Sequence, residues 1–541
     1  MSRYNYKRRD SREVKVAGLG IGGDNPVRLQ SMTNTSTNDI EASAAQARRI
    51  YEAGGELVRL TTQGVREAMA LGEIKKMLRD SGCPVPLSAD VHFNPKAAYA
   101  AAGTADKVRI NPGNFVDAAR TFRKLEFTDE EYGDEISKIE DALLPFLDIC
   151  RANGVAVRLG VNHGSLSDRI MSRYGDTPAG MVESVMEFLR ICRKHDFHDI
   201  VISIKASNTV VMTDTVRLLV GEMEREGMNY PLHLGVTEAG DAEDGRIKSA
   251  LGIGALLAEG LGDTIRVSLS EDPENEIPVA ALLRDYISSR ENHAPVVEPE
   301  YVAENGVKPS RDLSYRIKGE EDHIVAMHAD HPQGDFILVD ASESVAEPED
   351  DTPLVVTSRH RNAPGEIMSY IDRFQADGAR NPIVVSLHYD DSDLDMLRVK
   401  AAADFGILLL NGYASGIEVT DPRFDRETLA ELELGILQAA RLRVSKTEYI
   451  ACPSCGRTLF DLQKTLREVK EATKELKGLK IGVMGCIVNG PGEMADADYG
   501  YVGAGPGRVS LYRGKELVEK NIPAEEALPR LLALIESDRR Q

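Results

Sequence analysis

Residues 85–113 read VPLSADVHFNPKAAYAAAGTADKVRINPG, and this stretch holds two short apolar strands with a helical segment between them. The same alternation continues from about residue 25 to about residue 285, with helices such as 40–54 and 177–195. The predicted strands are VRLQSMTN (27–34), ELVRLTT (56–62), VPLSADVHF (85–93), KVRINPG (107–113), VAVRLGVN (155–162), IVISIKAS (200–207), PLHLGVTE (231–238) and TIRVSLSE (264–271). Eight such β–α units match the size of an α/β protein with a (β/α)8 TIM barrel. A doubly wound open sheet is the alternative, but eight units would be many for one such sheet.

The charge of the chain is unevenly distributed. Its 541 residues carry 65 Lys and Arg against 87 Asp and Glu, a formal net charge of −22. Residues 1–289, the predicted barrel domain, carry −8, residues 290–433 carry −17 and residues 434–541 carry +3. The acidic total argues against nucleic acid or an anionic membrane as the main partner, because both attract basic surfaces.

The sequence indicates a cytoplasmic protein with more than one domain. No apolar run approaches the roughly 18 residues of a membrane span. The basic start, MSRYNYKRRDSREVKV, lacks the apolar core of a secretory signal. Six cysteines are too few for a disulfide scaffold.

The middle segment, residues 290–433, has an α/β pattern of its own. Strands are expected at 335–341, 353–359, 381–389 and 405–412, with a helix over APGEIMSYIDRFQADG (363–378). We recognise no functional site in this segment from its sequence.

Polar side chains gather at the carboxyl ends of the predicted barrel strands, where TIM barrels carry their active sites. They are Arg59, Asp90, His92, Arg109, Asn111, Arg158, Asn162, His163, Lys205, Asn208, Glu238, Arg266 and Ser268. Residues two or four apart share one face of a strand, so Arg109 and Asn111 can point inward together. A ring of five cations among them is costly unless an anion binds within it. Although any single Arg could pair with a local acid, the five together favour a small ligand with two phosphate groups.

Three cysteines lie together in the pattern of the last segment. ACPSCGRTLFDLQ (451–463) contains Cys452 and Cys455 as C-x-x-C, and Cys486 ends the strand predicted in LKIGVMGCIVNGPGEMADADYG (479–500). This combination predicts a metal or cluster site. The other cysteines are scattered, and Cys150 and Cys192 are expected in the core.

Two other interpretations of the three thiols are weaker. A redox C-x-x-C needs no third cysteine. A structural zinc takes four Cys or His ligands, whereas all eleven histidines precede residue 434. An iron–sulfur cluster on three thiolates leaves one iron open to a carboxylate, water or substrate oxygen, which suits a catalytic cluster.

These cysteine motifs, with QSMTNT (30–35), RLGVNHGSL (158–166), PLHLGVTEAG (231–240) and GDTIRVSLSEDP (262–273), resemble the 4-hydroxy-3-methylbut-2-enyl diphosphate synthase family. The resemblance covers residues 1–289 and 434–541. It implies an α+β cluster domain with a 4Fe–4S cluster on Cys452, Cys455 and Cys486, and Glu493 as the fourth ligand. It also implies reductive ring opening and dehydroxylation of 2-C-methyl-D-erythritol 2,4-cyclodiphosphate, in the methylerythritol phosphate route to isoprenoids. The middle segment resembles the extra domain of the long form of this family, which we expect to act as a spacer.

On this resemblance we assign roles at the barrel mouth. The cations Arg59, Arg109, Arg158, Lys205 and Arg266 would hold the diphosphate, with hydrogen bonds from Asn111, Asn162 and Ser268. Asp90 would contact a substrate hydroxyl. Glu238 is the candidate proton donor, with a salt bridge to a neighbouring Arg as the alternative. Glu493 lies in a glycine-rich loop that would let it yield to the substrate.

The resemblance also implies partners. Family members take electrons from flavodoxin or ferredoxin, and family precedent favours a homodimer. A function of another class stays open, namely a non-redox, pterin-synthase-like barrel that binds a phosphate ligand and carries a structural metal domain. Broad visible absorbance of the anaerobically purified protein would separate the two.

Overall fold

The computed structural model describes residues 2–92, 94–116, 126–299, 324–343, 351–376, 379, 381–458, 460–487, 492, 494 and 496–539. Contacts within the chain divide it into two compact units. One unit comprises residues 10–242, 262–280 and 446–541, and it holds the barrel strands and the cysteine segment. The other comprises residues 1–9, 243–261 and 281–445, and it holds the middle segment.

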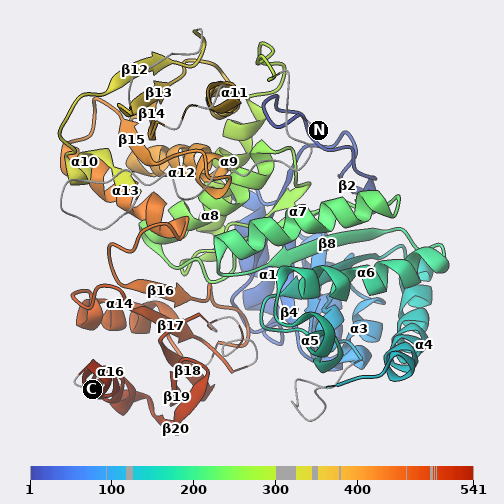
Figure 1. Ribbon diagram of the computed structural model, residues 1–541. Coiled ribbons are helices and arrows are strands. Elements are labelled where there is room, and N and C mark those ends of the chain that lie inside the picture. The colour runs from blue at the N-terminus through green and yellow to red at the C-terminus, as the bar shows by residue number, and fades with distance from the viewer. Residues whose placement is uncertain are drawn as a thin grey trace. The chain divides into compact units, whose positions relative to one another are not determined.

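Eight parallel strands form the barrel of the first unit (Figure 1). They are β3 (Arg28–Met32), β4 (Leu57–Thr62), β5 (Leu87–Val91), β6 (Lys107–Ile110), β7 (Ala156–Asn162), β8 (Ile200–Lys205), β9 (His233–Leu234) and β10 (Thr264–Ile265). Neighbours pair in the order β8-β7-β6-β5-β4-β3-β10-β9. A parallel bridge between Ile202 and Leu232 brings β9 back to β8. The strands therefore form a nearly closed ring, and the predicted TIM barrel is confirmed.

A short hairpin fills the amino-terminal end of the barrel. Its strands, β1 (Val14–Val16) and β2 (Leu19–Ile21), pack on residues at the starts of three barrel strands: Leu57, Ala156 and Val201. Because apolar side chains occupy this end, polar chemistry belongs to the opposite, carboxyl end.

Helices lie around the strands. They are α1 (Ile40–Glu52), α2 (Val65–Asp80), α3 (Pro95–Ala101), α4 (Asp129–Asn153), α5 (Asp168–Tyr174), α6 (Pro178–Lys194) and α7 (Thr209–Arg225). The side chains of Asp39, Thr128 and Asn208 accept hydrogen bonds from the first turns of α1, α4 and α7, as capping residues do. The helices predicted at 40–54 and 177–195 are confirmed by α1 and α6. None of the described helices has the length and apolar character needed to cross a bilayer.

The cysteine segment forms an α+β domain within the same unit. Its strands are β16 (Glu448–Ala451), β17 (Lys480–Met484), β18 (Tyr499–Gly505), β19 (Arg508–Arg513) and β20 (Glu516–Pro523), paired in that order, with helices α14 (Leu462–Thr473) and α16 (Ala524–Arg539). The strands β16 and β17 are parallel neighbours. Cys452 follows the first of them directly and Cys486 follows the second by two residues. Parallel pairing therefore brings cysteines 34 positions apart to one edge of the sheet.

The second unit contains a five-stranded parallel sheet. Its strands are β11 (Val325–Ala326), β12 (Ile337–Asp340), β13 (Leu354–Thr357), β14 (Ile383–His388) and β15 (Gly416–Thr420), in the order β11-β15-β14-β13-β12. Its helices are α8 (Ala242–Ala258), α10 (Met327–Asp330), α11 (Ala363–Ala376), α12 (Leu394–Leu410), α13 (Arg426–Ala439) and the part of α9 (Glu276–Ser288) from residue 281 onward. The boundary predicted after residue 433 falls inside α13.

The strand predicted at 405–412 is wrong, because most of this stretch is the end of helix α12. The helix packs closely on α8: a Cβ added at Gly406 would lie 2.5 Å from the carbonyl oxygen of Leu251. A helix that is buried on several sides is apolar all round, so its hydrophobic residues show no 3.6-residue period. The sequence FGILLLNG therefore has the same pattern as a buried strand. The sheet takes its missing strand from β15 instead.

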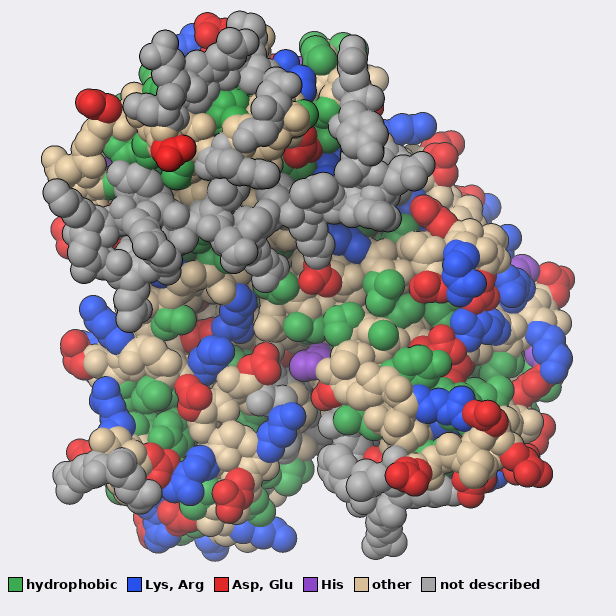
Figure 2. All heavy atoms as spheres, in the orientation of Figure 1, with side chains coloured by type: hydrophobic (Ala, Val, Ile, Leu, Met, Phe, Trp, Pro, Cys, Tyr) green, Lys and Arg blue, Asp and Glu red, His purple; other side chains and the backbone are tan. Residues whose placement is uncertain are grey.

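Charged side chains are mixed on the surface. On the face shown in Figure 2, basic and acidic side chains alternate over the described residues without a broad area of one sign. The cations expected to bind substrate are instead buried.

Candidate active site

The carboxyl ends of the barrel strands and the cysteine segment line one pocket within the first unit. The barrel supplies Met32, Arg59, Asp90, His92, Arg109, Arg158, Asn162, Ser203, Lys205, Thr237, Glu238, Arg266 and Ser268. The cysteine segment supplies Cys452, Pro453, Ser454, Cys455, Arg457, Thr458, Met484, Gly485 and Cys486. The five cations and the three cysteines singled out from the sequence thus face the same space, and residues of one chain line it from both sides.

Asp90, at the end of β5, is the central counter-ion of the pocket. Its Oδ1 accepts a hydrogen bond from Arg109 Nη1 at 3.2 Å, and its Oδ2 accepts one from Arg457 Nη2 at 2.9 Å. Arg158 Nη2 lies 3.8 Å from Oδ1. Burial alone would raise the pKa of Asp90, but Arg59, Arg109 and His92 hold that pKa well below its usual value. The carboxylate therefore orders the cations and ties Arg457 of the cysteine segment to the barrel.

Arg266 has its own buried carboxylate. Its Nε and Nη2 donate to the two oxygens of Glu276 at 3.1 and 2.9 Å, which is the bidentate geometry that suits Arg. Burial would lower the pKa of Arg266, but Glu276 raises it. Ser31 Oγ also donates to Glu276 at 2.6 Å, so this pair links β3 to the last barrel strand.

The carboxylates of the pocket do not fully neutralise the charge of the remaining cations, Arg59, Arg158 and Lys205. Burial lowers the pKa of Arg59 to about 10. The charge of Asp90 opposes this shift, whereas Arg266 and Arg109 lower the pKa further. Burial also lowers the pKa of Lys205 well below its usual value, and Arg59 and Arg158 lower it further. Among the described residues, Nε and Nη1 of Arg158 have no hydrogen-bond partner. An anion in this pocket would supply the missing charge and acceptors.

Glu238 combines burial with a strained backbone. It is 4% exposed, lines the pocket, and has a φ of +50°, a region that non-glycine residues rarely adopt. The next residue, Ala239, forms a parallel bridge with Ala451, immediately before Cys452. This bridge holds the Glu238 loop beside the cysteine segment, and strain of this kind is typical of functional sites.

The cysteines suit a polynuclear cluster in type and placement. The backbone N–H of Gly485 donates to Cys452 Sγ at 3.3 Å, a contact that stabilises thiolate sulfur. Burial raises the pKa of the Cys452 thiol, a cost that a bound metal would offset. Within the described ranges, no three His, Cys, Asp or Glu side chains are arranged as ligands of a single metal ion.

Among the described residues predicted to form the site, Asn111 does not line the pocket. Asn111 is buried beside it, where Oδ1 accepts from the Gly113 N–H at 3.1 Å and Nδ2 donates to Ser165 Oγ at 3.1 Å. Its side chain therefore shapes the loop after β6. Glu493 lies outside the described residues.

The sequence did not reveal three of the residues that organise the site. Arg457 lies two residues after Cys455, and a cation so close to two thiols was a usable signal. No sequence signal pointed to Glu276, because nothing in EDPENEIP indicates that this glutamate pairs with Arg266. Met32 was also missed; its Sδ lies 2.9 Å from Arg59 Nη2 and braces that guanidinium.

The loop after β7 touches the loop that carries Glu493. A Cβ added at Gly164, where φ is +82°, would lie 2.5 Å from the carbonyl oxygen of Gly492. Asp176 Oδ1 accepts from the Gly164 N–H at 3.3 Å and lies 3.6 Å from His163 Nε2. Only a residue without a side chain fits at this contact between barrel and cysteine segment.

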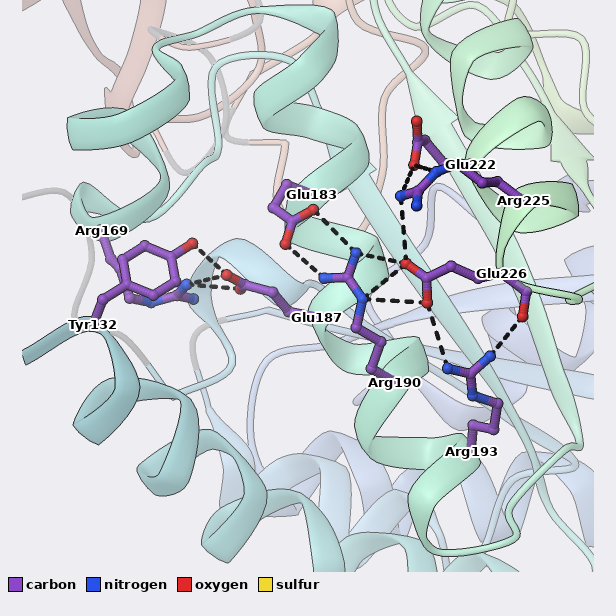
Figure 3. A network of polar contacts seen from close by, with 9 residues as sticks. All are labelled: Tyr132, Arg169, Glu183, Glu187, Arg190, Arg193, Glu222, Arg225 and Glu226. Atoms are coloured by element: carbon purple, nitrogen blue, oxygen red, sulfur yellow. Dashed lines mark hydrogen bonds and ion pairs between the residues drawn. The ribbon is translucent and has the colours of Figure 1, made fainter. Parts of the chain in front are cut away.

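The helix that follows this loop, α5, is anchored by a buried ion pair. Arg169 Nη1 donates to both oxygens of Glu187 on α6, at 2.5 and 2.7 Å, and the Tyr132 hydroxyl donates to the same carboxylate (Figure 3). Next to this pair, Arg190 bridges Glu183, also on α6, and Glu226, the residue that follows α7. The pair between Arg169 and Glu187 holds α5 against α6, and thereby the end of the loop that meets the cysteine segment.

Comparison with known families identifies the chain. The model of the GcpE TIM-barrel domain matches residues 11–281, and that of the GcpE protein C-terminal domain matches residues 448–537. The chain belongs to the GcpE family. The two matches coincide with the barrel and with the α+β domain that carries the cysteines.

Full-length relatives of this GcpE-family chain share one name. The protein of Bacteroides fragilis is 52% identical, over 99% of this chain and 97% of its own length. That of Bacteroides thetaiotaomicron is 52% identical over 100% of both, and that of Protochlamydia amoebophila is 40% identical over 98% of this chain and 96% of its own. Each is named 4-hydroxy-3-methylbut-2-en-1-yl diphosphate synthase (flavodoxin). The family resemblance is confirmed, and the pterin-synthase-like alternative is not favoured.

The similar solved structures add little to the family assignment. Dihydropteroate synthase from Stenotrophomonas maltophilia is 15% identical and covers 53% of this chain and 100% of its own, with a TM-score of 0.35. A likeness at that level supports no functional comparison.

Proposed function

We propose that this chain is an oxidoreductase that converts 2-C-methyl-D-erythritol 2,4-cyclodiphosphate to 4-hydroxy-3-methylbut-2-enyl diphosphate. The observation that carries the proposal is one pocket in which five buried cations face three cysteines, in a chain 52% identical to synthases of that name along its whole length. The conversion removes one hydroxyl as water and consumes two electrons and two protons. It requires an anion site, an electron source and an acid in one space.

The cations of the barrel mouth would bind the diphosphate. Arg158 and Lys205 are the strongest candidates, because burial and the neighbouring arginines lower the pKa of each well below its usual value, and an anion would reverse that shift. Arg59, Arg109 and Arg266 would complete the set, held in place by Asp90 and Glu276. Further hydrogen bonds would come from Asn162 and Ser268, which line the pocket, whereas Asn111, whose amide contacts Gly113 and Ser165, would act by shaping the loop after β6.

The proposed role of Asp90 follows from its position. A carboxylate that already accepts from Arg109 and Arg457 keeps lone pairs for a substrate hydroxyl. Asp90 would thus orient the substrate while holding the cysteine segment against the barrel.

We propose that Cys452, Cys455 and Cys486 hold a 4Fe–4S cluster, with Glu493 as the fourth ligand. When bound, the cluster would relay the two electrons from the electron carrier to the substrate, one at a time. The chain itself would provide the Gly485 N–H at Cys452 Sγ and the facing wall of the barrel mouth.

Glu238 is the proposed acid. Its carboxyl lines the pocket beside Cys452, so a proton on its Oε could pass to the leaving oxygen or to a substrate carbon. Because the side chain is 4% exposed and lines the pocket, the carboxyl is held away from bulk solvent.

Flavodoxin is the proposed electron donor, on the printed name of the relatives, with ferredoxin as the other carrier to be tested. The proposed location is the cytoplasm. Because one chain lines the pocket from both sides, the expected homodimer is not needed to complete the site, and light scattering would test it.

Turnover by the anaerobically reconstituted full chain tests the proposal. The cyclic diphosphate should be consumed only when reduced flavodoxin or ferredoxin is present, and the protein should absorb broadly in the visible range. A colourless, zinc-loaded protein that binds the substrate with full affinity but never reduces it would contradict the proposal.

A further inference from the structure

A second polar pocket lies in the other unit, at the carboxyl ends of its parallel strands. It is formed where β13 and β14 end and where α11 begins, and it has a volume of about 160 Å³. Open parallel sheets bind ligands at this edge. The volume is below the roughly 300–1,000 Å³ typical of drug-sized ligands, so the pocket suits a small group.

A buried guanidinium forms the floor of this pocket. Arg290 is 2% exposed and contacts Asp404, which also accepts hydrogen bonds from the hydroxyls of Tyr286 at 2.6 Å and Tyr389 at 3.0 Å. Three donors therefore share one carboxylate. Among the described residues, Arg290 Nη1 has no hydrogen-bond partner. A buried cationic donor left without an acceptor is costly, so this atom points to a missing anion.

Two further arginines line the rim. Arg359 and Arg361 are exposed and flank His360 in the loop between β13 and α11. That histidine is held in place, because Nδ1 accepts from the Asn362 N–H at 3.0 Å and Nε2 lies 3.0 Å from the Ala294 carbonyl oxygen. The loop thus places two exposed arginines on either side of a histidine that is held in place.

The start of α11 adds to this field. Ala363 and Pro364 line the pocket in its first turn, and a helix amino terminus attracts anions. Of the described lining residues, only Asp404 is acidic, and its charge is already shared among three donors. This cationic pocket lies in a segment whose net charge is −17.

We propose that this pocket binds a small phosphate-bearing anion through Arg290, Arg359 and Arg361. The anion would accept from the buried Nη1 and from the two rim guanidiniums, and its charge would face the first turn of α11. The middle segment then has a ligand site of its own, separate from the barrel mouth and independent of the proposed reaction.

Equilibrium dialysis of the full chain with radiolabelled inorganic phosphate tests this. The double variant Arg359→Gln/Arg361→Gln should bind one equivalent less than the unmodified chain, or bind it at least about tenfold more weakly. The matched control, Arg423→Gln/Arg426→Gln, removes the same charge from the loop between β15 and α13 and from the first residue of α13, outside the pocket, and should bind as the unmodified chain does. Equal binding by the chain and the first variant, or equal losses in both variants, would overturn the proposal.

A third variant tests the buried donor. Arg290→Lys keeps a cation for Asp404 but lacks the forked second nitrogen. It should lose the same equivalent of phosphate although both rim arginines remain. Unchanged binding would remove Arg290 from the site. None of these variants changes a residue of the barrel mouth, so each should still turn over the cyclic diphosphate. Failure of the phosphate-site proposal can therefore be distinguished from failure of the proposed reaction.

Discussion

Replacing Asp90 by Asn tests whether the barrel mouth depends on one buried carboxylate. Asp90 is 4% exposed and accepts from Arg109 at 3.2 Å and from Arg457 at 2.9 Å. Each hydrogen bond to a charged group contributes about 1.5–3 kcal/mol. Removing one partner of a buried ion pair costs about 3–5 kcal/mol, because it leaves the other charges uncompensated. We therefore expect the free energy of unfolding to fall by about 3–5 kcal/mol at pH 7.

Urea unfolding followed by circular dichroism measures this loss. The matched control is Asp106→Asn, at the start of β6 and thus at the opposite end of the barrel, where the carboxylate pairs with the partly exposed Lys75 at 2.7 Å. The control should lose less, because its cationic partner remains solvated. A loss below about 1 kcal/mol for Asp90→Asn, or equal losses in the two variants, would refute the reasoning.

The pH dependence gives an independent check. Burial would raise the pKa of Asp90, but the neighbouring cations hold it well below the unfolded value of about 3.9. A depressed folded pKa contributes stability that is fully present above the unfolded pKa and is lost as the pH falls through the folded one. The stability difference between the unmodified chain and Asp90→Asn should be constant from about pH 8 to 5 and shrink below about pH 4. A difference that grows on acidification would contradict this sign.

Three further substitutions test other parts of the site. Glu238→Gln should keep the affinity for the cyclic diphosphate, measured by calorimetry, and lose turnover; near-normal kcat would remove its role as the acid. Cys486→Ser should lose visible absorbance and turnover together, whereas Cys192→Ser, in the barrel core, should keep both; a coloured, active Cys486→Ser protein would exclude that ligand. Gly164→Ala should lose most turnover, because its Cβ would meet the facing loop at 2.5 Å. Gly154→Ala, also at positive φ but in open space, should lose only about 1–2 kcal/mol of stability and remain active.

The sequence allowed most elements of the fold to be predicted, because short strands and amphipathic helices have distinct periods. It failed at 405–412, where a helix buried on several sides loses its period and reads as a strand. It also failed to reveal the ion pair between Arg266 and Glu276, since nothing local in either segment specifies the partner. The cationic pocket around Arg290 was missed for the same reason: its residues come from α9, the end of β13 and α12.

The sequence by itself determined the chemical types at the site, namely five cations at strand ends and three cysteines in a spaced motif, because these are local properties of residue and position. Only the tertiary structure decided which charges compensate one another, since Asp90 and Arg457 lie 367 positions apart and meet at 2.9 Å. It also decided that barrel and cysteines share one pocket, with the cations left in excess there. That excess arises because closure of the barrel and pairing of β16 with β17 bury charges from distant segments together, where water cannot screen them.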